Sequence, residues 1–221
     1  MRGINLSGFV CAIAFIYFQS SLHAGLQWDS KILEIRAKGS DKQSVGHFKF
    51  RNTGPTPVNI LTVAASCSCT AAVADRKTYQ PGETGEIVAT FTLGGREGLS
   101  QKVITVVTDD PQQKNIFLNF NVFIPPVLTL DPPFLVWGSG EELTPKTVHI
   151  SAGSDYPVHD LTVTSSNPNV EAKLATLSPG KEYQLSIVPK DRTARIIALV
   201  KVRADYPTDR PKAYFVTVHV Q

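Results

Sequence analysis

The chain has 221 residues, 42% of them hydrophobic, and its 22 basic and 19 acidic residues give a formal net charge of +3. A near-neutral chain without a run of lysine and arginine does not favour nucleic acid as a partner. The length suits one large β domain or two of ordinary size.

The first 24 residues have the pattern of a cleaved signal peptide. Arg2 is their only charged residue, an apolar run extends from Phe9 to Phe18, and Ala24 supplies a small residue at the cleavage point. The run is too short for a membrane-spanning helix of about 20 residues, and no later segment is apolar enough. We therefore predict cleavage after residue 24 and a mature chain without a membrane span. We expect a periplasmic or secreted location, which is an oxidising compartment.

Hydrophobic residues recur at every second position in several segments. This is the spacing of strands that place one face on a core and the other in water. Ile116 to Ile124 is the clearest run, Ile196 to Val202 has the same spacing, and so do Val103, Thr105 and Val107. No segment has the period of a sustained amphipathic helix.

Short sequences rich in glycine, proline and asparagine separate these runs. They include Asn52-Thr-Gly-Pro55, Gln80-Pro-Gly82 and Asp109-Asp-Pro111. Short strands separated by such turns at intervals of about 8–12 residues favour a β-sandwich or barrel. Gly94-Gly-Arg-Glu-Gly98 is the nearest approach to a glycine-rich loop, but no helix follows it, and we interpret it as a hairpin turn.

The sequence repeats itself about a hundred residues further on. The matching pairs are Pro57–Val63 with Pro157–Val163, Gln80–Gly82 with Ser178–Gly180, and Val106–Pro111 with Val202–Pro207. The order is kept and the offset changes little, which indicates duplication of one module. We place the junction at Ile124-Pro125-Pro126, where two prolines stiffen the connection. The two predicted domains are therefore residues 25–124 and 125–221.

The first copy carries a set of motifs in a fixed order. They are Phe48-Lys-Phe50 with Asn52 and Gly54, Ser66-Cys-Ser-Cys-Thr70, Pro81-Gly-Glu83 and Thr108-Asp-Asp-Pro111. In these motifs the copy resembles the bacterial domain-of-unknown-function family 1573, whose signature is Ser-Cys-Gly-Cys-Thr. The resemblance implies an immunoglobulin-like sandwich, related to the Hydin and major-sperm-protein modules, in exported proteins with no assigned activity. The expected fold is all-β, with two tandem immunoglobulin-like β-sandwich domains after the signal peptide.

Two features depart from the family pattern. Ser68 stands where the family has glycine, and the second copy has Asn167-Pro-Asn169 where Cys67-Ser-Cys69 would align. The second domain therefore cannot share any function of the cysteines. We expect it to provide packing, spacing or an interaction surface.

Cys67 and Cys69 are the only cysteines left after cleavage, so they pair with each other, bind something together or stay free. On an extended strand the Cα atoms of residues two apart are about 6.6 Å apart, and the Cβ atoms are too distant for a disulfide. At a turn or bulge the bridge can close. A three-residue loop would give the bridge only about 1.6 kcal/mol of entropic stabilisation, against about 4 for a 60-residue loop.

Three hypotheses for Cys67 and Cys69 stay open. The first is a local disulfide, or two thiols, without reactivity of consequence. The second is a soft-metal site, because two thiolates can hold Cu(I); zinc would need further ligands, such as His47 or a partner chain. The third is thiol–disulfide exchange.

Enzyme signatures are missing from the sequence. It contains no Gly-x-Ser-x-Gly, no His-Glu-x-x-His, no phosphate-binding glycine loop and no dinucleotide fingerprint. The histidines of the mature chain lack a paired metal spacing: His47, His149, His159 and His219. Four aromatic residues could contact a carbohydrate or protein, although such residues more often lie in a core or at a domain junction: Trp28, Trp137, Tyr156 and Tyr206.

These observations favour a non-enzymatic interaction or scaffold module of the cell envelope. We expect a protein partner and no cofactor, because exposed loops and strand edges on a rigid frame suit such binding. The alternative is Cu(I) binding or a redox role through Cys67 and Cys69.

Overall fold

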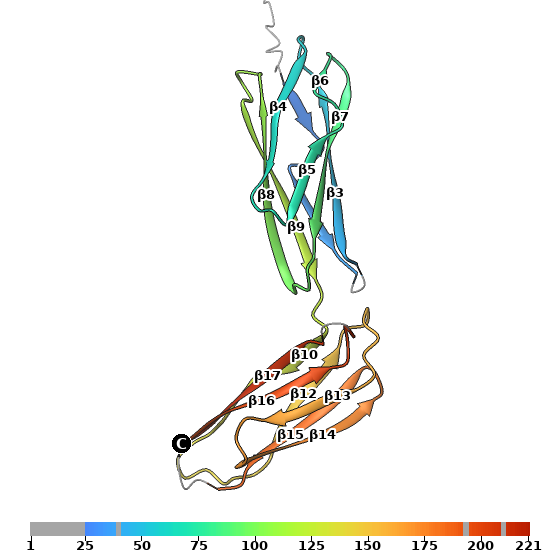
Figure 1. Ribbon diagram of the computed structural model, residues 1–221. Coiled ribbons are helices and arrows are strands. Elements are labelled where there is room, and N and C mark those ends of the chain that lie inside the picture. The colour runs from blue at the N-terminus through green and yellow to red at the C-terminus, as the bar shows by residue number, and fades with distance from the viewer. Residues whose placement is uncertain (1–24, 39–40, 192–194, 209–210) are drawn as a thin grey trace, which may run out of the picture.

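The computed structural model describes residues 25–38, 41–191, 195–208 and 211–221. Their regular structure is β-strand throughout and forms two sandwiches joined end to end (Figure 1). Nowhere in these ranges does a helix occur that could cross a membrane. The all-β prediction is therefore confirmed. The predicted signal peptide, residues 1–24, lies outside the described residues, and its cleavage stays a prediction.

The first sandwich packs a four-stranded sheet against a five-stranded sheet. The four-stranded sheet has the order β1 (Leu26–Trp28), β3 (Gln43–Asn52), β7 (Thr84–Thr92), β5 (Thr70–Ala74). The five-stranded sheet has the order β2 (Ile32–Arg36), β9 (Asn115–Ile124), β8 (Gly98–Thr108), β4 (Val58–Ala65), β6 (Thr78–Tyr79). Strands β2 and β9 are parallel, and the other pairs are antiparallel.

The second sandwich packs two four-stranded sheets. The first has the order β10 (Leu128–Asp131), β12 (Lys146–Ala152), β15 (Glu182–Pro189), β14 (Val170–Ser178). The other has the order β11 (Phe134–Trp137), β17 (Ala213–Val220), β16 (Ile196–Ala204), β13 (Leu161–Ser165). Strands β11 and β17 are parallel, like β2 and β9.

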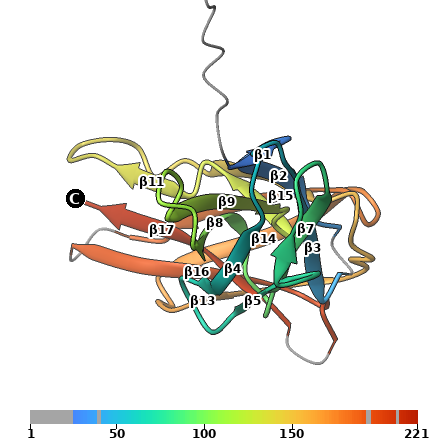
Figure 2. The same cartoon turned by 90° about the horizontal axis from the view of Figure 1, so that it is seen from above.

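The second domain therefore repeats the strand order and pairing of the first. Within the described residues, β6 is the one strand without a counterpart. Both domains have the immunoglobulin-like arrangement of two facing sheets. Viewed along the first domain, in Figure 2, the strands of the second run across the line of sight, so the two sandwiches are not coaxial.

Alternation along the strands places one face of each sheet on the core, as the sequence predicts. In β9 the buried side chains are Ile116, Leu118, Phe120, Val122 and Ile124. In β8 the spacing was right but the face was the opposite one: Ile104 and Val106 are buried, whereas Val103 is 39% exposed. Both faces of β8 carry apolar residues here, so alternation could not distinguish them.

The glycine turn after β7 is not a hairpin, contrary to the prediction. β7 belongs to the four-stranded sheet and β8 to the five-stranded one, so the turn crosses between sheets. Gly94 and Gly95 have positive φ angles of 56° and 72°, a conformation that favours glycine. The crossing brings Glu97 to the end of the first domain that faces the second.

Glu97 is the centre of the domain junction. Its Oε1 atom accepts hydrogen bonds from the Val127 N–H at 2.9 Å and the Tyr214 hydroxyl at 2.5 Å. The Lys212 Nζ lies 2.7 Å from the same oxygen. The Tyr156 hydroxyl donates to the Pro125 carbonyl, which ties the linker to the second domain.

The four aromatic residues singled out in the sequence lie in cores or at this junction. Trp137 is fully buried in the second domain, and Trp28 packs on Phe50 with ring centroids 4.7 Å apart. Tyr156 and Tyr206 contact each other at the junction, with centroids 5.5 Å apart. This agrees with the core or junction positions that are usual for such side chains.

Candidate functional site

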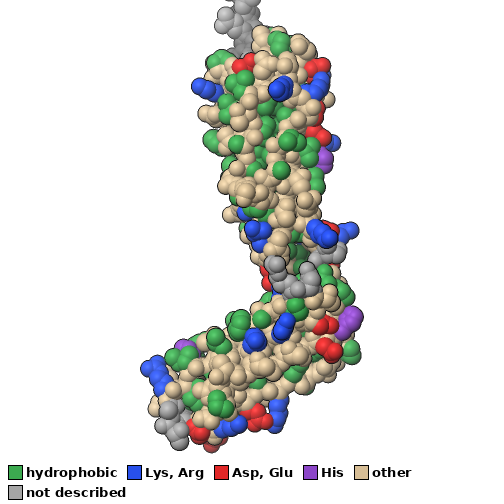
Figure 3. Space-filling model, in the orientation of Figure 1, with side chains coloured by type: hydrophobic (Ala, Val, Ile, Leu, Met, Phe, Trp, Pro, Cys, Tyr) green, Lys and Arg blue, Asp and Glu red, His purple; other side chains and the backbone are tan. Residues whose placement is uncertain are grey.

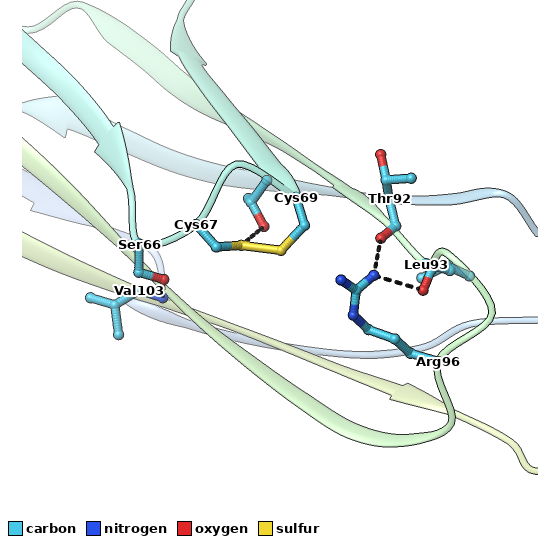
Figure 4. The surroundings of a disulfide bond; sticks show 8 residues. Ser66, Cys67, Cys69, Thr92, Leu93, Arg96 and Val103 are labelled. Carbon is cyan, nitrogen blue, oxygen red and sulfur yellow. Dashed lines mark hydrogen bonds between the residues drawn. A yellow bond between two sulfur atoms is a disulfide. The ribbon is translucent and has the colours of Figure 1, made fainter.

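Cys67 and Cys69 lie in the turn between β4 and β5, where the chain crosses from one sheet to the other. Their sulfur atoms are bonded to each other, with Cα atoms 5.3 Å apart (Figure 4). The strands stop at Ala65 and resume at Thr70, so the pair is not held in the extended conformation that would forbid a bridge. Of the hypotheses drawn from the sequence, the structure contains the local disulfide.

Four hydrogen bonds hold this turn in place. The Ser66 N–H donates to the Val103 carbonyl at 2.9 Å, and the Val103 N–H donates back to the Ser66 Oγ at 3.2 Å. The Thr70 N–H donates to the Cys67 carbonyl at 3.2 Å. The Thr92 N–H donates to the Cys69 carbonyl at 2.9 Å. The turn is thereby tied to β8 on one side and to β7 on the other.

The corresponding turn of the second domain makes the same four hydrogen bonds without cysteines. They are Ser166 N–H to Leu199 carbonyl at 3.0 Å, Leu199 N–H to Ser166 Oγ at 2.9 Å, Val170 N–H to Asn167 carbonyl at 3.1 Å and Lys190 N–H to Asn169 carbonyl at 2.8 Å. Asn167 thus replaces Cys67, and Asn169 replaces Cys69.

A side-chain hydrogen bond stands in the second turn where the first has its disulfide. The Asn167 Oδ1 accepts the Asn169 N–H at 2.8 Å, a local contact that asparagine commonly makes in turns. The same backbone geometry therefore forms with and without a covalent bridge. It follows that the Cys67–Cys69 bond is not needed to shape this turn.

The surroundings of the disulfide are partly polar. Both cysteines are half-buried, and Cys69 packs against the core of the first domain. The Cys67 Sγ lies 3.5 Å from the Oγ1 of Thr70, whose side chain is buried. Because a disulfide sulfur has no proton, the hydroxyl is the donor of this contact.

Two cations lie beside the turn. The Arg96 guanidinium and the Lys102 ammonium are 5.7 Å and 5.1 Å from the ring centroid of Phe91, which is the β7 partner of Thr70. Figure 4 shows the Arg96 side chain reaching back toward the disulfide turn, where it donates to the Thr92 and Leu93 carbonyls at 3.2 Å and 3.1 Å.

His47, the further zinc ligand considered from the sequence, does not lie beside the cysteines. His47 pairs with Val88 on β7, four residues from Thr92, and its Nδ1 lies 3.1 Å from the Glu86 carboxylate. No cluster of three or more metal-binding side chains occurs in the described part of the chain. Neither sulfur of the bridged pair is a thiolate, so copper could bind only after reduction. The copper hypothesis stays a prediction.

A cavity of about 520 Å³ lies beside the domain junction. Its lining includes Leu93, Ile124 and Val127, with Tyr156 and Tyr206 next to them. Asp41 contributes the one carboxylate among its described lining residues.

The sequence identified Ser66 and Thr70 as the ends of the family signature but assigned them no contact, and it did not connect Arg96 or Lys102 with the cysteines. A signal for Ser66 was present, because Ser166 stands at the same place in the second copy. The positions of Arg96 and Lys102 depend on the crossing of the chain between sheets, which the hairpin interpretation missed.

The family model for proteins of unknown function, DUF1573, matches residues 26–124. The match covers the first domain and less than half of the 221 residues. The resemblance seen in the sequence is therefore confirmed, and the family carries no assigned activity. The sequence matches none of the curated proteins.

Solved structures similar to this chain include the following three. A protein of unknown function from Porphyromonas gingivalis W83 is 16% identical over 88% of this chain and 99% of its own, with a TM-score of 0.35. The ASH/PapD-like domain 7 of human CEP192 is 12% identical over 57% and 98%, with a TM-score of 0.37. Protocadherin gamma C5 is 11% identical over 90% and 68%, with a TM-score of 0.36. None of these similarities indicates an activity.

Proposed function

We propose that the protein is an exported, non-enzymatic interaction module of the cell envelope, with a protein-binding face on each domain. The proposed face is the outer surface of the sheet that contains β8 in the first domain and of the sheet that contains β16 in the second. The observation that carries the proposal is that both surfaces expose large apolar side chains at the same three positions.

The hydrogen-bond registers establish which positions correspond. Val103 and Leu199 correspond because each bonds to the serine of its turn. Ile32 pairs with Asn119, the β9 partner of Val103. In the same way Phe134 pairs with Thr217, the β17 partner of Leu199.

Phe117 and Phe215 complete the correspondence, two residues before Asn119 and Thr217 on the same faces. We call the set Ile32, Val103 and Phe117 with Phe134, Leu199 and Phe215 the apolar outer faces. Each of the six side chains is 39% to 57% exposed.

A single exposed apolar side chain is ordinary and needs no explanation. Here, however, both copies have a large apolar side chain at the same three positions, although the residue type differs at two of them. A group of exposed apolar side chains on one face is typical of a protein interaction site. Figure 3 shows basic and acidic side chains interspersed among the hydrophobic ones, a distribution that suits a protein partner better than a polyanion.

Site-specific photo-crosslinking in the source cells tests the proposal. A photoreactive residue at Phe117 or Phe215 is expected to capture one discrete envelope protein from each position. The matched controls are Lys49 and Lys173, which are exposed on the other sheet of each domain. No capture from either apolar position, or the same capture from the controls, would overturn the proposal.

A further inference from the structure

We propose that the Cys67–Cys69 disulfide is redox-active and exchanges with the thiols of another polypeptide. The inference adds an activity to the binding role, and only the choice of a polypeptide as substrate rests on the proposed function. Its basis is the comparison of the two equivalent turns, together with the groups that contact the sulfur atoms.

The bridge is dispensable for the structure around it. The second domain closes the same turn with the same four hydrogen bonds and with asparagines at both cysteine positions. A bridge across three residues also restricts the unfolded chain very little. Reduction therefore leaves a turn that is already shaped, and the oxidised and reduced forms share one backbone.

The reduced pair has a neighbouring group that can stabilise a thiolate. The Thr70 hydroxyl, 3.5 Å from the Cys67 Sγ, can donate to a thiolate at that position. Thr70 is buried, so its hydroxyl is held beside the sulfur. Groups that stabilise the thiolate stabilise the reduced pair, and this makes the disulfide a better oxidant.

A substrate can reach the bridge. Neither cysteine is fully buried, and Ser68 between them is exposed. Val103 links the bridge to the apolar outer face, because its backbone bonds to Ser66 while its side chain is exposed on that face. A polypeptide bound on the face would therefore have its cysteines close to the disulfide.

The reaction balances without a further reagent. A substrate thiolate attacks one sulfur of the bridge, the Cys67–Cys69 bond breaks, and the other sulfur leaves as a thiolate. A second substrate thiol, as its thiolate, then attacks the substrate sulfur of the mixed disulfide. The substrate gains a disulfide and loses two electrons, which the cysteine pair takes up. The two protons released by the substrate thiols end on the cysteine thiols or in solvent.

Equilibration of the mature protein with glutathione buffers tests the redox step by itself. We expect the pair to pass from oxidised to reduced within the range of ratios that glutathione provides, as counted by mass after alkylation. A structural disulfide resists reduction by glutathione. A pair that stays oxidised at every ratio, or a domain that unfolds on reduction, would overturn the proposal.

Thr70→Val tests the hydroxyl, since the second domain carries Val170 at this position. The variant is expected to fold, and its reduced thiols should react several-fold more slowly with an alkylating agent at neutral pH. Its thiolate absorbance should also appear at higher pH than in the wild type. If Thr70 had only a structural role, neither the alkylation rate nor the thiolate titration would change. Unchanged values of both would therefore contradict the positioning role of Thr70.

A reduced, unfolded peptide with two cysteines tests the choice of substrate. Its oxidation by the wild type is expected to be faster than oxidation of glutathione at equal thiol concentration, and Phe117→Ser should remove the advantage. If glutathione is oxidised but the peptide is oxidised no faster, the redox activity is supported and the binding role of the apolar outer face is contradicted. If neither thiol reacts, the redox activity fails whatever the face binds.

Discussion

At the scale of single residues, the family motifs have packing tasks that can be followed atom by atom. Asn52 is fully buried; its Nδ2 donates to the Thr56 and Tyr79 carbonyls, both at 2.9 Å, and its Oδ1 accepts the Gly54 N–H at 3.0 Å. Close to the Pro81-Gly-Glu83 motif, a Cβ atom at Gly85 would lie 2.2 Å from the Tyr79 ring, which leaves room only for glycine. The cysteine pair is only half-buried, with Cys69 against the core, and its turn forms in the second domain without a bridge.

Asn52→Ala should lower the free energy of unfolding of the first domain by about 2–3 kcal/mol. The reason is that two buried groups, the Tyr79 carbonyl and the Gly54 N–H, lose their partner, at a cost of at least about 1 kcal/mol each. Thr56 is exposed, so water replaces the bond to its carbonyl. Urea denaturation measures the loss. Asn115→Ala, at an exposed end of β9, is the control and should change stability by less than about 0.5 kcal/mol. Equal effects of the two substitutions would contradict the role assigned to Asn52.

Burial of tyrosines predicts a loss of stability in alkali. Burial raises the pKa of Tyr79, Tyr156 and Tyr214, and that of Tyr156 reaches about 12, with the charges of Glu97 and Asp155 adding to the effect. An unfolded tyrosine has a pKa of about 10. The folded state therefore holds protons that the unfolded state has released, and its stability falls as pH rises from about 10 to 12.

Denaturation midpoints measured at several pH values check this dependence. They should be steady below about pH 9 and fall above pH 10. Tyr156→Phe should reduce the slope between pH 10 and 12, because it removes one of the titrating groups. A midpoint that is independent of pH over this range would show that the buried tyrosines do not contribute.

At the scale of elements, the turn of the second domain can replace the disulfide turn of the first. The triple replacement Cys67→Asn, Ser68→Pro, Cys69→Asn gives the first domain the turn of the second. We expect the melting temperature to drop by no more than about 10 °C, the equivalent of the bridge's 1.6 kcal/mol. Calorimetry of the exported protein measures it. A domain that no longer folds would show that the bridge carries structural weight.

Much of this element layout could be predicted from the sequence. Alternation in β9 and β16 identified the core faces, and the matched turn sequences revealed two modules. The face of β8 was wrong because apolar residues occupy both of its sides. The glycine turn was wrong because local sequence determines that a chain turns, whereas partner strands determine which sheet it enters. The cysteine site was found, but not Arg96 and Lys102, which approach it only through that crossing.

At the scale of the whole molecule, a single carboxylate connects the two domains. Glu97 belongs to the first domain, and its three partners belong to the linker and the second domain. Arg36 and Asp155 add a charge pair at 4.0 Å across the same junction, exposed enough to contribute little. Two prolines in the linker would permit either rigid or loose docking. The contacts of Glu97 favour a fixed angle.

Glu97→Ala should let the domains move independently. Loss of three hydrogen-bonded partners at the junction removes the contacts that fix the angle, while both cores stay intact. NMR relaxation should give one rotational correlation time for both domains in the wild type and two shorter ones in the variant. The control is Glu86→Ala, whose carboxylate pairs with His47 away from the junction. Equal correlation times in wild type and variant would show that Glu97 does not hold the junction.

The two parallel strand pairs give the chain a mechanical property. In each domain the strand near the entering chain lies parallel to the strand that leaves it: β2 beside β9 and β11 beside β17. Tension between the ends pulls these partners in opposite directions along their length, so their hydrogen bonds are loaded together in shear and not opened one at a time. We expect two separate, high-force rupture events when single molecules are stretched end to end. Low-force, gradual extension would be the contrary result. A tether that resists pulling would suit a protein that holds partners together at a cell surface.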